Sequence, residues 1–260
     1  MSERARGADV TRAEICATAV ADAFRGDGEI LASAFGTVPT VGIRLAKLTH
    51  EPDLMMTDGV CMLLENVPPV SGPTNGEPQI EGWLPFRSVF DLLWSGRRHV
   101  IMTASQIDRF GNHNFACIGD FTKPKSQLLG MRGAPGNTIN HPTSYWVPRH
   151  SARVFVERVD VVSGVGYDRA RELGTSARFH EIRRVVSNLG VFDFETPDHR
   201  MRLRTVHPGV EVDQVLEATG FEIALPETVE ETRAPNESEL HIIREVLDPE
   251  GLREREVPAS

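Results

Sequence analysis

The residues best suited to bind a ligand lie between Gly130 and His141. Gly130, Gly133 and Gly136 fall within seven residues of one another. Glycine lets a backbone approach a ligand closely and adopt positive φ angles. The N–H groups of such a turn can converge on an anion or on a developing oxyanion. The segment therefore predicts a glycine turn whose backbone faces a ligand.

Three polar side chains accompany this predicted turn. Arg132 would add a fixed, bidentate positive charge for a carboxylate or a phosphate. Asn137 and His141 would add neutral hydrogen-bonding groups. A structural loop with a surface arginine is an equally acceptable interpretation, because loops carry function but most glycine turns only turn the chain. The spacing matches neither a Walker A motif nor a dinucleotide fingerprint.

A second polar segment precedes this one and reads Gln-Ile-Asp-Arg-Phe-Gly-Asn-His-Asn. Gly111 and Asn112 suit a hairpin turn, and Asp108 and Arg109 could form an ion pair that braces it. His113 could act as a base, but nothing fixes a partner for it. The histidines lack the i, i+4 spacing of a helical metal pair, and no Gly-x-Ser-x-Gly elbow occurs. We predict no metal site and no serine hydrolase triad.

The elements that must position these residues alternate between helix and strand early in the chain, and strands crowd together later. A capping-box pattern opens a first helix at 11–24. Further helices are predicted at 41–48, 84–94, 212–219 and 237–247, and strands at 29–34, 53–57, 100–104, 154–156, 184–186 and 201–206. A long loop is predicted at 65–82. This order favours an α/β fold with a mixed, mostly parallel sheet flanked by helices.

The 260 residues suit one domain with a modest appendage. We predict an α/β domain at 1–225 and a charged C-terminal extension at 226–260. The extension is predicted to hold one helix, which Asn236 would cap.

Composition excludes several functions. The net charge is −9, and an acidic chain repels phosphate polymers, so we predict no nucleic-acid partner. Cys16, Cys61 and Cys117 are too few and too scattered for a disulfide framework, which indicates a reducing compartment. No apolar run is long enough to span a membrane, and the N-terminus lacks the apolar stretch of a signal peptide. We expect a soluble, cytoplasmic protein without a membrane partner.

Five segments recur in the order of one protein family. They are Thr-Asp-Gly-Val at 57–60, the polar segment at 106–112, the glycine segment at 130–137, Val-Val-Ser-Asn-Leu-Gly-Val-Phe-Asp at 185–193 and His-Pro-Gly-Val at 207–210. In this order they resemble the β subunits of class I CoA-transferases over nearly the whole chain. The resemblance implies a single CoA-transferase-like α/β domain.

Three further segments narrow the resemblance. Arg-Gly-Ala-Pro-Gly-Asn-Thr-Ile-Asn-His at 132–141, with 144–146 and 161–168, is similar to a branch of the family that hydrolyses steroid rings. This similarity implies an α2β2 assembly with an α subunit. It also implies that the last steroid ring opens in a cyclic β-keto CoA thioester. Coenzyme A is then part of an acyl-CoA substrate, and no separate cofactor is implied.

One segment departs from the transferase pattern. The family's nucleophilic glutamate lies in a Ser-Glu-Asn-Gly-like turn and accepts the acyl group covalently. Here Asp58 stands in that turn; it is one methylene shorter, and the asparagine is missing. A carboxylate displaced by more than about an ångström loses much of its catalytic advantage. We therefore predict that Asp58 is a vestige of the nucleophile. Glu65 precedes an asparagine too, but it lies seven residues later.

The reaction that remains is hydrolytic C–C cleavage, and the resemblance implies that its general base is a glutamate of the α subunit. No catalytic residue is assigned to this chain, which would position the substrate. We predict that Arg132 binds a substrate carboxylate. The backbone of Gly133, Ala134 and Gly136 would face the thioester or pantetheine, and Asn137 and His141 would assist. Two alternatives stay open: a transferase that uses Asp58 or Glu65, and a non-catalytic acyl-CoA-binding scaffold.

Overall fold

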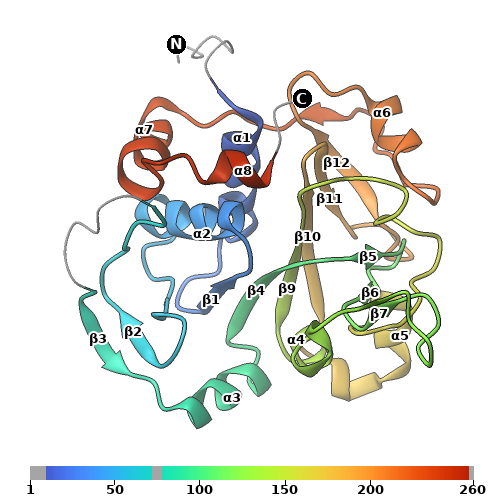
Figure 1. Ribbon diagram of the computed structural model, residues 1–260, viewed down its shortest axis with the longest axis horizontal. Helices are drawn as coiled ribbons and strands as arrows, with labels where there is room; N and C mark the ends of the chain where they lie inside the picture. The colour runs from blue at the N-terminus through green and yellow to red at the C-terminus, as the bar shows by residue number, and fades with distance from the viewer. Residues whose placement is uncertain (1–9, 72–77, 258–260) are drawn as a thin grey trace.

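The fold is built on one seven-stranded sheet (Figure 1). The computed structural model describes residues 10–71 and 78–257. In spatial order the strands are β1 (Leu31–Ala34), β4 (Arg98–Thr103), β9 (Pro142–Val147), β10 (Glu181–Ser187), β11 (Gly190–Asp193), β12 (Arg202–Val206) and β13 (Glu230–Glu231). Only the two pairings of β11 are antiparallel. The predicted mixed, mostly parallel sheet flanked by helices is confirmed.

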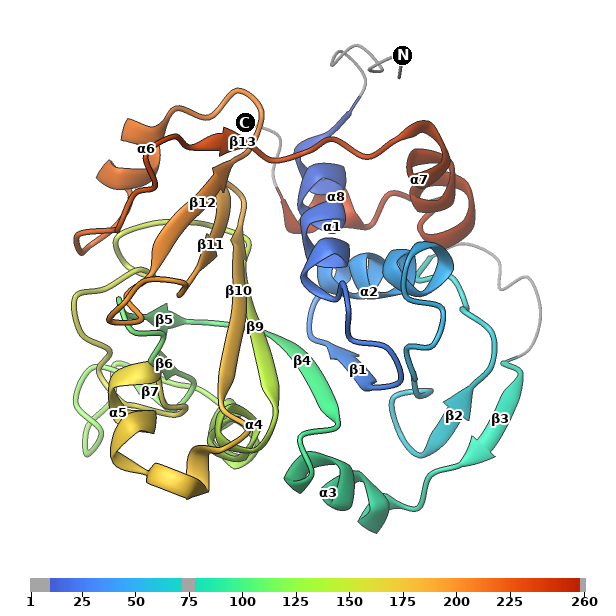
Figure 2. The same cartoon turned by 180° about the vertical axis from the view of Figure 1, so that it is seen from behind.

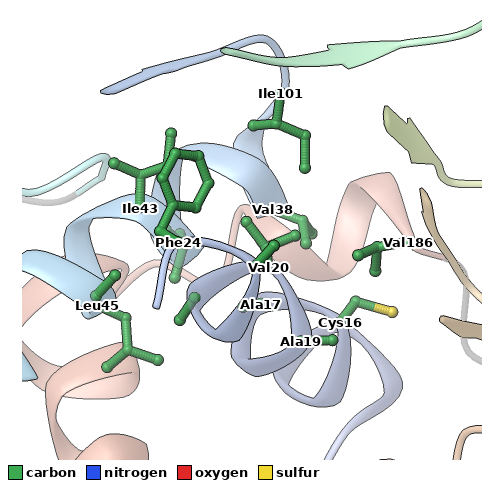
Figure 3. Close-up of a cluster of buried hydrophobic side chains, with 14 of the residues drawn as sticks. Cys16, Ala17, Ala19, Val20, Phe24, Val38, Ile43, Leu45, Ile101 and Val186 are labelled. Atoms are coloured by element: carbon green, nitrogen blue, oxygen red, sulfur yellow. The ribbon is translucent and has the colours of Figure 1, made fainter. Parts of the chain in front are cut away.

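The two faces of the sheet bury separate hydrophobic clusters, because consecutive strand residues point to opposite sides. One face packs against α1 (Arg12–Ala23) and α2 (Thr37–Thr49), and Figure 3 shows Ile101 and Val186 facing these helices. The opposite face packs against the segments between β5 and α6. Residues that alternate in this way are Ile101 and Met102, Trp146 and Tyr145, and Val186 and Val185.

The two N-terminal helices pack closely on each other. The predicted capping box of α1 is confirmed, since Thr11 and Glu14 bond each other's backbone N–H groups. A Cβ added at Gly42 of α2 would come within 2.5 Å of Val20. Glycine is therefore needed where the helices meet. Helix α2 begins four residues before the predicted start at residue 41.

The remaining elements lie outside the main sheet. They are β2 (Met62–Leu64) with β3 (Ile80–Trp83), α3 (Phe86–Trp94), β5 (Gln106–Ile107) with β6 (His113–Asn114), β7 (Cys117–Ile118) with β8 (Ser126–Gln127), α4 (Ala134–Asn140), α5 (Tyr167–Glu172) and α6 (Val212–Glu217), with short 3-10 turns at Gly130–Arg132 and Gly174–Ala177. The predicted hairpin turn at Gly111 is confirmed between β5 and β6.

Three predicted elements need correction. The predicted strands at 53–57 and 154–156 are reduced to isolated bridges, of which Met55 and Phe155 are the paired residues. The predicted loop at 65–82 contains most of β3, because Ile80 to Gly82 pair with β2. Residues 72–77 of that loop, like the N-terminal residues 1–9, lie outside the described residues.

The C-terminal segment is more than an extension with one helix. Asn236 caps α7 (Glu237–His241) as predicted, and a π-helix (Ile242–Leu247) continues it. The segment also supplies β13 and α8 (Arg253–Glu256). Glu256 accepts the Val38 backbone N–H at 2.7 Å and the Trp146 indole N–H at 3.0 Å. The prediction of a single helix is wrong because this charged segment folds against α1, α2 and the sheet.

Candidate functional site

A cavity of about 480 Å³ lies between β1, α2, α3 and the turn at 57–60. Helix α2 contributes Thr40, Ile43 and Arg44, which share one helix face at three- and four-residue spacing. Asp58 lines the opposite wall, and Arg98 enters from the first position of β4, where it pairs with Leu31. The sheet therefore brings together charged residues that are far apart in sequence.

Asp58 is held by its own turn. Its Oδ1 atom accepts the backbone N–H groups of Val60, Cys61 and Met62 at 2.9, 3.0 and 3.1 Å. These hydrogen bonds, that of Met62 most of all, lower the pKa of Asp58 below its ordinary value. The carboxylate is therefore a stable, weakly basic group that organises the turn. Glu65 is exposed and does not line this cavity.

Arg98 connects this cavity to a second one. Its Nε atom donates to Ser33 Oγ at 3.1 Å, and its Nη1 atom donates to Asn137 Oδ1 at 3.1 Å. Burial lowers the pKa of Arg98 to about 10, so the guanidinium stays protonated at neutral pH. Asn137 lines the second cavity, and Phe35 lines both.

The second cavity is mostly apolar and has a volume of about 390 Å³. Its apolar lining comes from Phe35, Met102, Phe115, Leu129 and Ala134. An apolar concavity with a few polar groups at its edge is typical of a site for a hydrophobic small molecule.

The glycine segment that contributes to this cavity is helical. The prediction of a positive-φ turn is wrong: a 3-10 turn runs into α4, and Gly133 has a φ of −106°. Pro135 lies in the first turn of α4, where a missing N–H costs nothing. Gly130 serves packing, because an added Cβ would lie 2.5 Å from Phe115.

The structure separates the six predicted binding residues. Gly133, Ala134 and Asn137 line the apolar cavity. Arg132 and Gly136 are exposed and line neither cavity. His141 is fully buried behind Asn137, with its Nε2 atom 3.3 Å from Asn137 Oδ1. Burial lowers the pKa of His141 to about 3, so it is a neutral support for Asn137.

The earlier polar segment forms a structural turn. The predicted ion pair between Asp108 and Arg109 is wrong, because Arg109 pairs with Glu157. Asp108 instead accepts the N–H groups of Phe110 and Asn112. His113 is fully buried against Tyr145, and burial lowers its pKa to about 3. A histidine that is buried and neutral in this way braces the fold and has no access to water.

Sequence reasoning missed Arg44 and Arg98. Arg44 stands between the buried residues Ile43 and Leu45 of a helix, and Arg98 opens a buried strand. A charged residue inside an apolar pattern was the available signal. The described residues contain no group of three or more His, Cys, Asp or Glu side chains that could hold a metal ion. No described helix is long and apolar enough to cross a membrane.

The architecture and the cavity beside the 57–60 turn define a class of protein. The family model for coenzyme A transferase matches residues 90–218. One of the two subunits of a 3-oxoadipate CoA-transferase from Pseudomonas knackmussii is 31% identical over 222 residues, which are 80% of this chain and 82% of that protein. The chain belongs to the coenzyme A transferase family.

More similar relatives carry a different activity in their names. A cholesterol ring-cleaving hydrolase IpdB subunit of Rhodococcus jostii is 55% identical over 249 residues, covering 96% of this chain and 97% of that protein. The crystal structure of Rhodococcus jostii IpdAB matches with a TM-score of 0.91 and 55% identity, covering 96% of this chain and 100% of that chain. The resemblance predicted from the sequence is thereby confirmed.

Proposed function

We propose that this chain is the β subunit of a heteromeric hydrolase that opens the last steroid ring of a cyclic β-keto acyl-CoA. The observation that carries the proposal is 55% identity, along almost the full length, to a protein named as a cholesterol ring-cleaving hydrolase subunit. The apolar cavity beside Asn137 supports it, because a carbon ring system needs an apolar container. The coenzyme is then part of the substrate.

The reaction is the addition of water across a C–C bond. A base removes a proton from water, and the hydroxide adds to the ring ketone. The bond between that carbon and the thioester α-carbon then breaks. Its electron pair forms a thioester enolate, which is protonated, and the ketone carbon becomes a carboxylate. The site must stabilise two successive oxyanions.

Within this scheme the chain positions the substrate, and a glutamate of the α subunit acts as the base. Asn137 supplies a polar edge to the apolar cavity, and His141 fixes its orientation. The backbone of Gly133 and Ala134 lies on the same cavity wall. Arg132 and Gly136, on the adjoining exposed surface, would contact the outer part of the thioester.

The α subunit is proposed to cover an exposed apolar face around α3. Trp83, Phe86 and Trp94 are 69%, 71% and 61% exposed. Figure 2 shows α3 at one end of the molecule, before β4 enters the sheet. Contiguous aromatic side chains in water mark interaction sites. We therefore expect an α2β2 enzyme, inactive as the isolated chain and located in the cytoplasm.

A transferase mechanism is the second candidate, since relatives of this family are named as CoA-transferases. It would need Asp58 or Glu65 as the nucleophile. The hydrogen bonds at Asp58 Oδ1 disfavour attack by this group, because they lower its basicity. A scaffold that only binds acyl-CoA is the third candidate.

One experiment separates these functions. The chain is co-purified with its α subunit and given a cyclic β-keto CoA thioester in water labelled with heavy oxygen. Hydrolysis places one heavy oxygen in the newly formed carboxylate of the product. Borohydride or hydroxylamine is then used to trap any acyl-CoA adduct. An adduct on Asp58 or Glu65 would establish transfer, and binding without turnover would establish the scaffold.

A further inference from the structure

We propose that Arg44 and Arg98 together form a carboxylate-binding site in the cavity beside the 57–60 turn. Resting on the proposed function, the inference assigns this site a carboxylate that the substrate carries or that ring opening creates. Both arginines line the cavity, one from α2 and one from β4.

Arg44 is a buried cation without a partner in the described part of the chain. Its Nε and Nη1 atoms are inaccessible to solvent and have no hydrogen-bond partner among the described residues. Neither do those residues provide a carboxylate in ion-pair contact with it. A buried charge is costly unless it is paired. An anion that enters the cavity would provide the missing pair.

Arg98 is also uncompensated, but it is fixed in place. Its two acceptors, Ser33 Oγ and Asn137 Oδ1, are neutral. These bonds orient the planar guanidinium and leave its positive charge unneutralised. Asp58, which also lines the cavity, directs its Oδ1 atom to three backbone N–H groups. The cavity therefore holds two cations, and its single acid is engaged by its own turn.

Other arginines of this chain show what structural use of the same side chain involves. Arg253 donates to Glu14 at 2.9 Å and to Asp248 at 3.1 Å. Arg202 donates to both oxygens of Asp193, at 2.9 and 2.8 Å. Where arginine only supports the fold, the chain provides a carboxylate. Arg44 and Arg98 lack one among the described residues, and the cavity in front of them is open.

A carboxylate suits the site in chemistry and in the timing of its appearance. Two guanidinium groups can each donate to a carboxylate in a bidentate manner. During ring opening the ketone carbon gains the oxygen of water and ends as a carboxylate, with release of one proton. The arginines would thus bind the group that is formed when the C–C bond breaks. Arg132, the residue predicted from sequence for this role, is exposed and lies outside the cavity.

The test compares two ligands of equal length on the intact two-subunit enzyme. Pimeloyl-CoA ends in a carboxylate, and heptanoyl-CoA ends in a methyl group. We expect the wild type to bind pimeloyl-CoA about 10- to 100-fold more tightly, as one to two charge-assisted hydrogen bonds would provide. Isothermal titration measures both affinities.

Three variants and one control make the test specific. Arg44→Gln removes a charge whose Nε and Nη1 atoms have no hydrogen bond to lose, so the fold should stay intact and the preference for pimeloyl-CoA should disappear. Arg44→Lys keeps the charge and should retain part of the preference. Arg98→Gln should behave like Arg44→Gln, with circular dichroism to verify folding. Arg153→Gln changes an exposed arginine outside the cavity and should leave both affinities unchanged.

Kinetics separate the two sources of the carboxylate. With a cyclohexanone β-keto CoA thioester, which has no carboxylate before cleavage, a lower kcat in Arg44→Gln indicates that the new carboxylate is bound. An unchanged kcat, with a raised KM only for a substrate that carries a carboxylate, indicates that the existing group is bound. Either result supports the proposal.

Equal wild-type affinity for the two ligands, or a preference that survives in folded Arg44→Gln, would overturn the proposal. Loss of the α subunit from Arg44→Gln in size-exclusion chromatography, without a change in ligand preference, would also overturn it, because the partner would then neutralise Arg44. These results are independent of the proposed function. If the wild type prefers pimeloyl-CoA but does not open the ring, only the hydrolase assignment fails.

Discussion

Buried arginines serve two different purposes in two regions of this protein. Behind α1, Arg253 is enclosed by Glu14 and Asp248, which match its charge inside the chain. In the cavity beside β1, Arg44 and Arg98 have no matching carboxylate among the described residues. Figure 1 shows that α8, which carries Arg253, and β4, which carries Arg98, lie in separate parts of the molecule. The comparison teaches that an internal partner marks a structural charge and that its absence marks a binding site.

The largest expected effect is on the structural region. Arg253→Met should lower the free energy of unfolding by about 3–5 kcal/mol, because it leaves Glu14 and Asp248 buried with less compensation. Arg44→Met should leave stability nearly unchanged or raise it, since an unpaired cation is removed. Denaturant unfolding of both variants measures the difference. Equal losses in the two variants would break the comparison.

Acid should act on the same structural region. Burial raises the pKa of Glu14 and of Asp248, but hydrogen bonds from Arg244 to Glu14 and from Ser71 to Asp248 outweigh it, so both pKa values lie below their ordinary ones. A lowered folded pKa stabilises the fold above the unfolded value, and this stabilisation is lost as the pH falls. Unfolding free energy should therefore decline below about pH 4.5. The decline should be shallower in Arg253→Met and unchanged in Arg44→Met.

Packing at the apolar cavity gives a smaller effect. Gly130→Ala should destabilise the protein by about 1–3 kcal/mol, because the added methyl group overlaps Phe115. Gly133→Ala is the matched control, since nothing lies within 4 Å of its added Cβ. Thermal unfolding of the pair tests this. A stable Gly130→Ala variant would show that Phe115 can move and that the cavity wall is not fixed.

The smallest expected effect is at Asp58. Asp58→Asn keeps an oxygen that can accept the N–H groups of Val60, Cys61 and Met62, so the turn should persist. Ring cleavage should continue near the wild-type rate. Loss of a true nucleophile would instead cost on the order of ten-thousandfold or more in kcat.

The sequence predicted the sheet better than the site. Apolar and β-branched runs correctly indicated β4, β10 and β12, because burial of those strands depends on local side-chain type. The glycine segment was misread as a turn. Its glycines occur in helical conformation, where Gly130 packs against a neighbour, Phe115, that is distant in sequence.

Charged residues were the hardest to interpret. The sequence drew attention to Arg132 because it adjoins glycines, yet the structure leaves it exposed. Arg44 and Arg98 become neighbours of one cavity only after β1 pairs with β4 and α2 packs beside them. Sequence also could not show that Asp58 would be engaged by its own turn, since that depends on the local backbone path.

Turnover by the Asp58→Asn enzyme, co-purified with its α subunit in water labelled with heavy oxygen, tests the central claim most directly. Mass spectrometry of the ring-opened product should find one heavy oxygen in the new carboxylate, at a rate close to that of the wild type. Loss of turnover in the folded variant, together with an acyl-CoA adduct trapped on Asp58 of the wild type, would contradict the account.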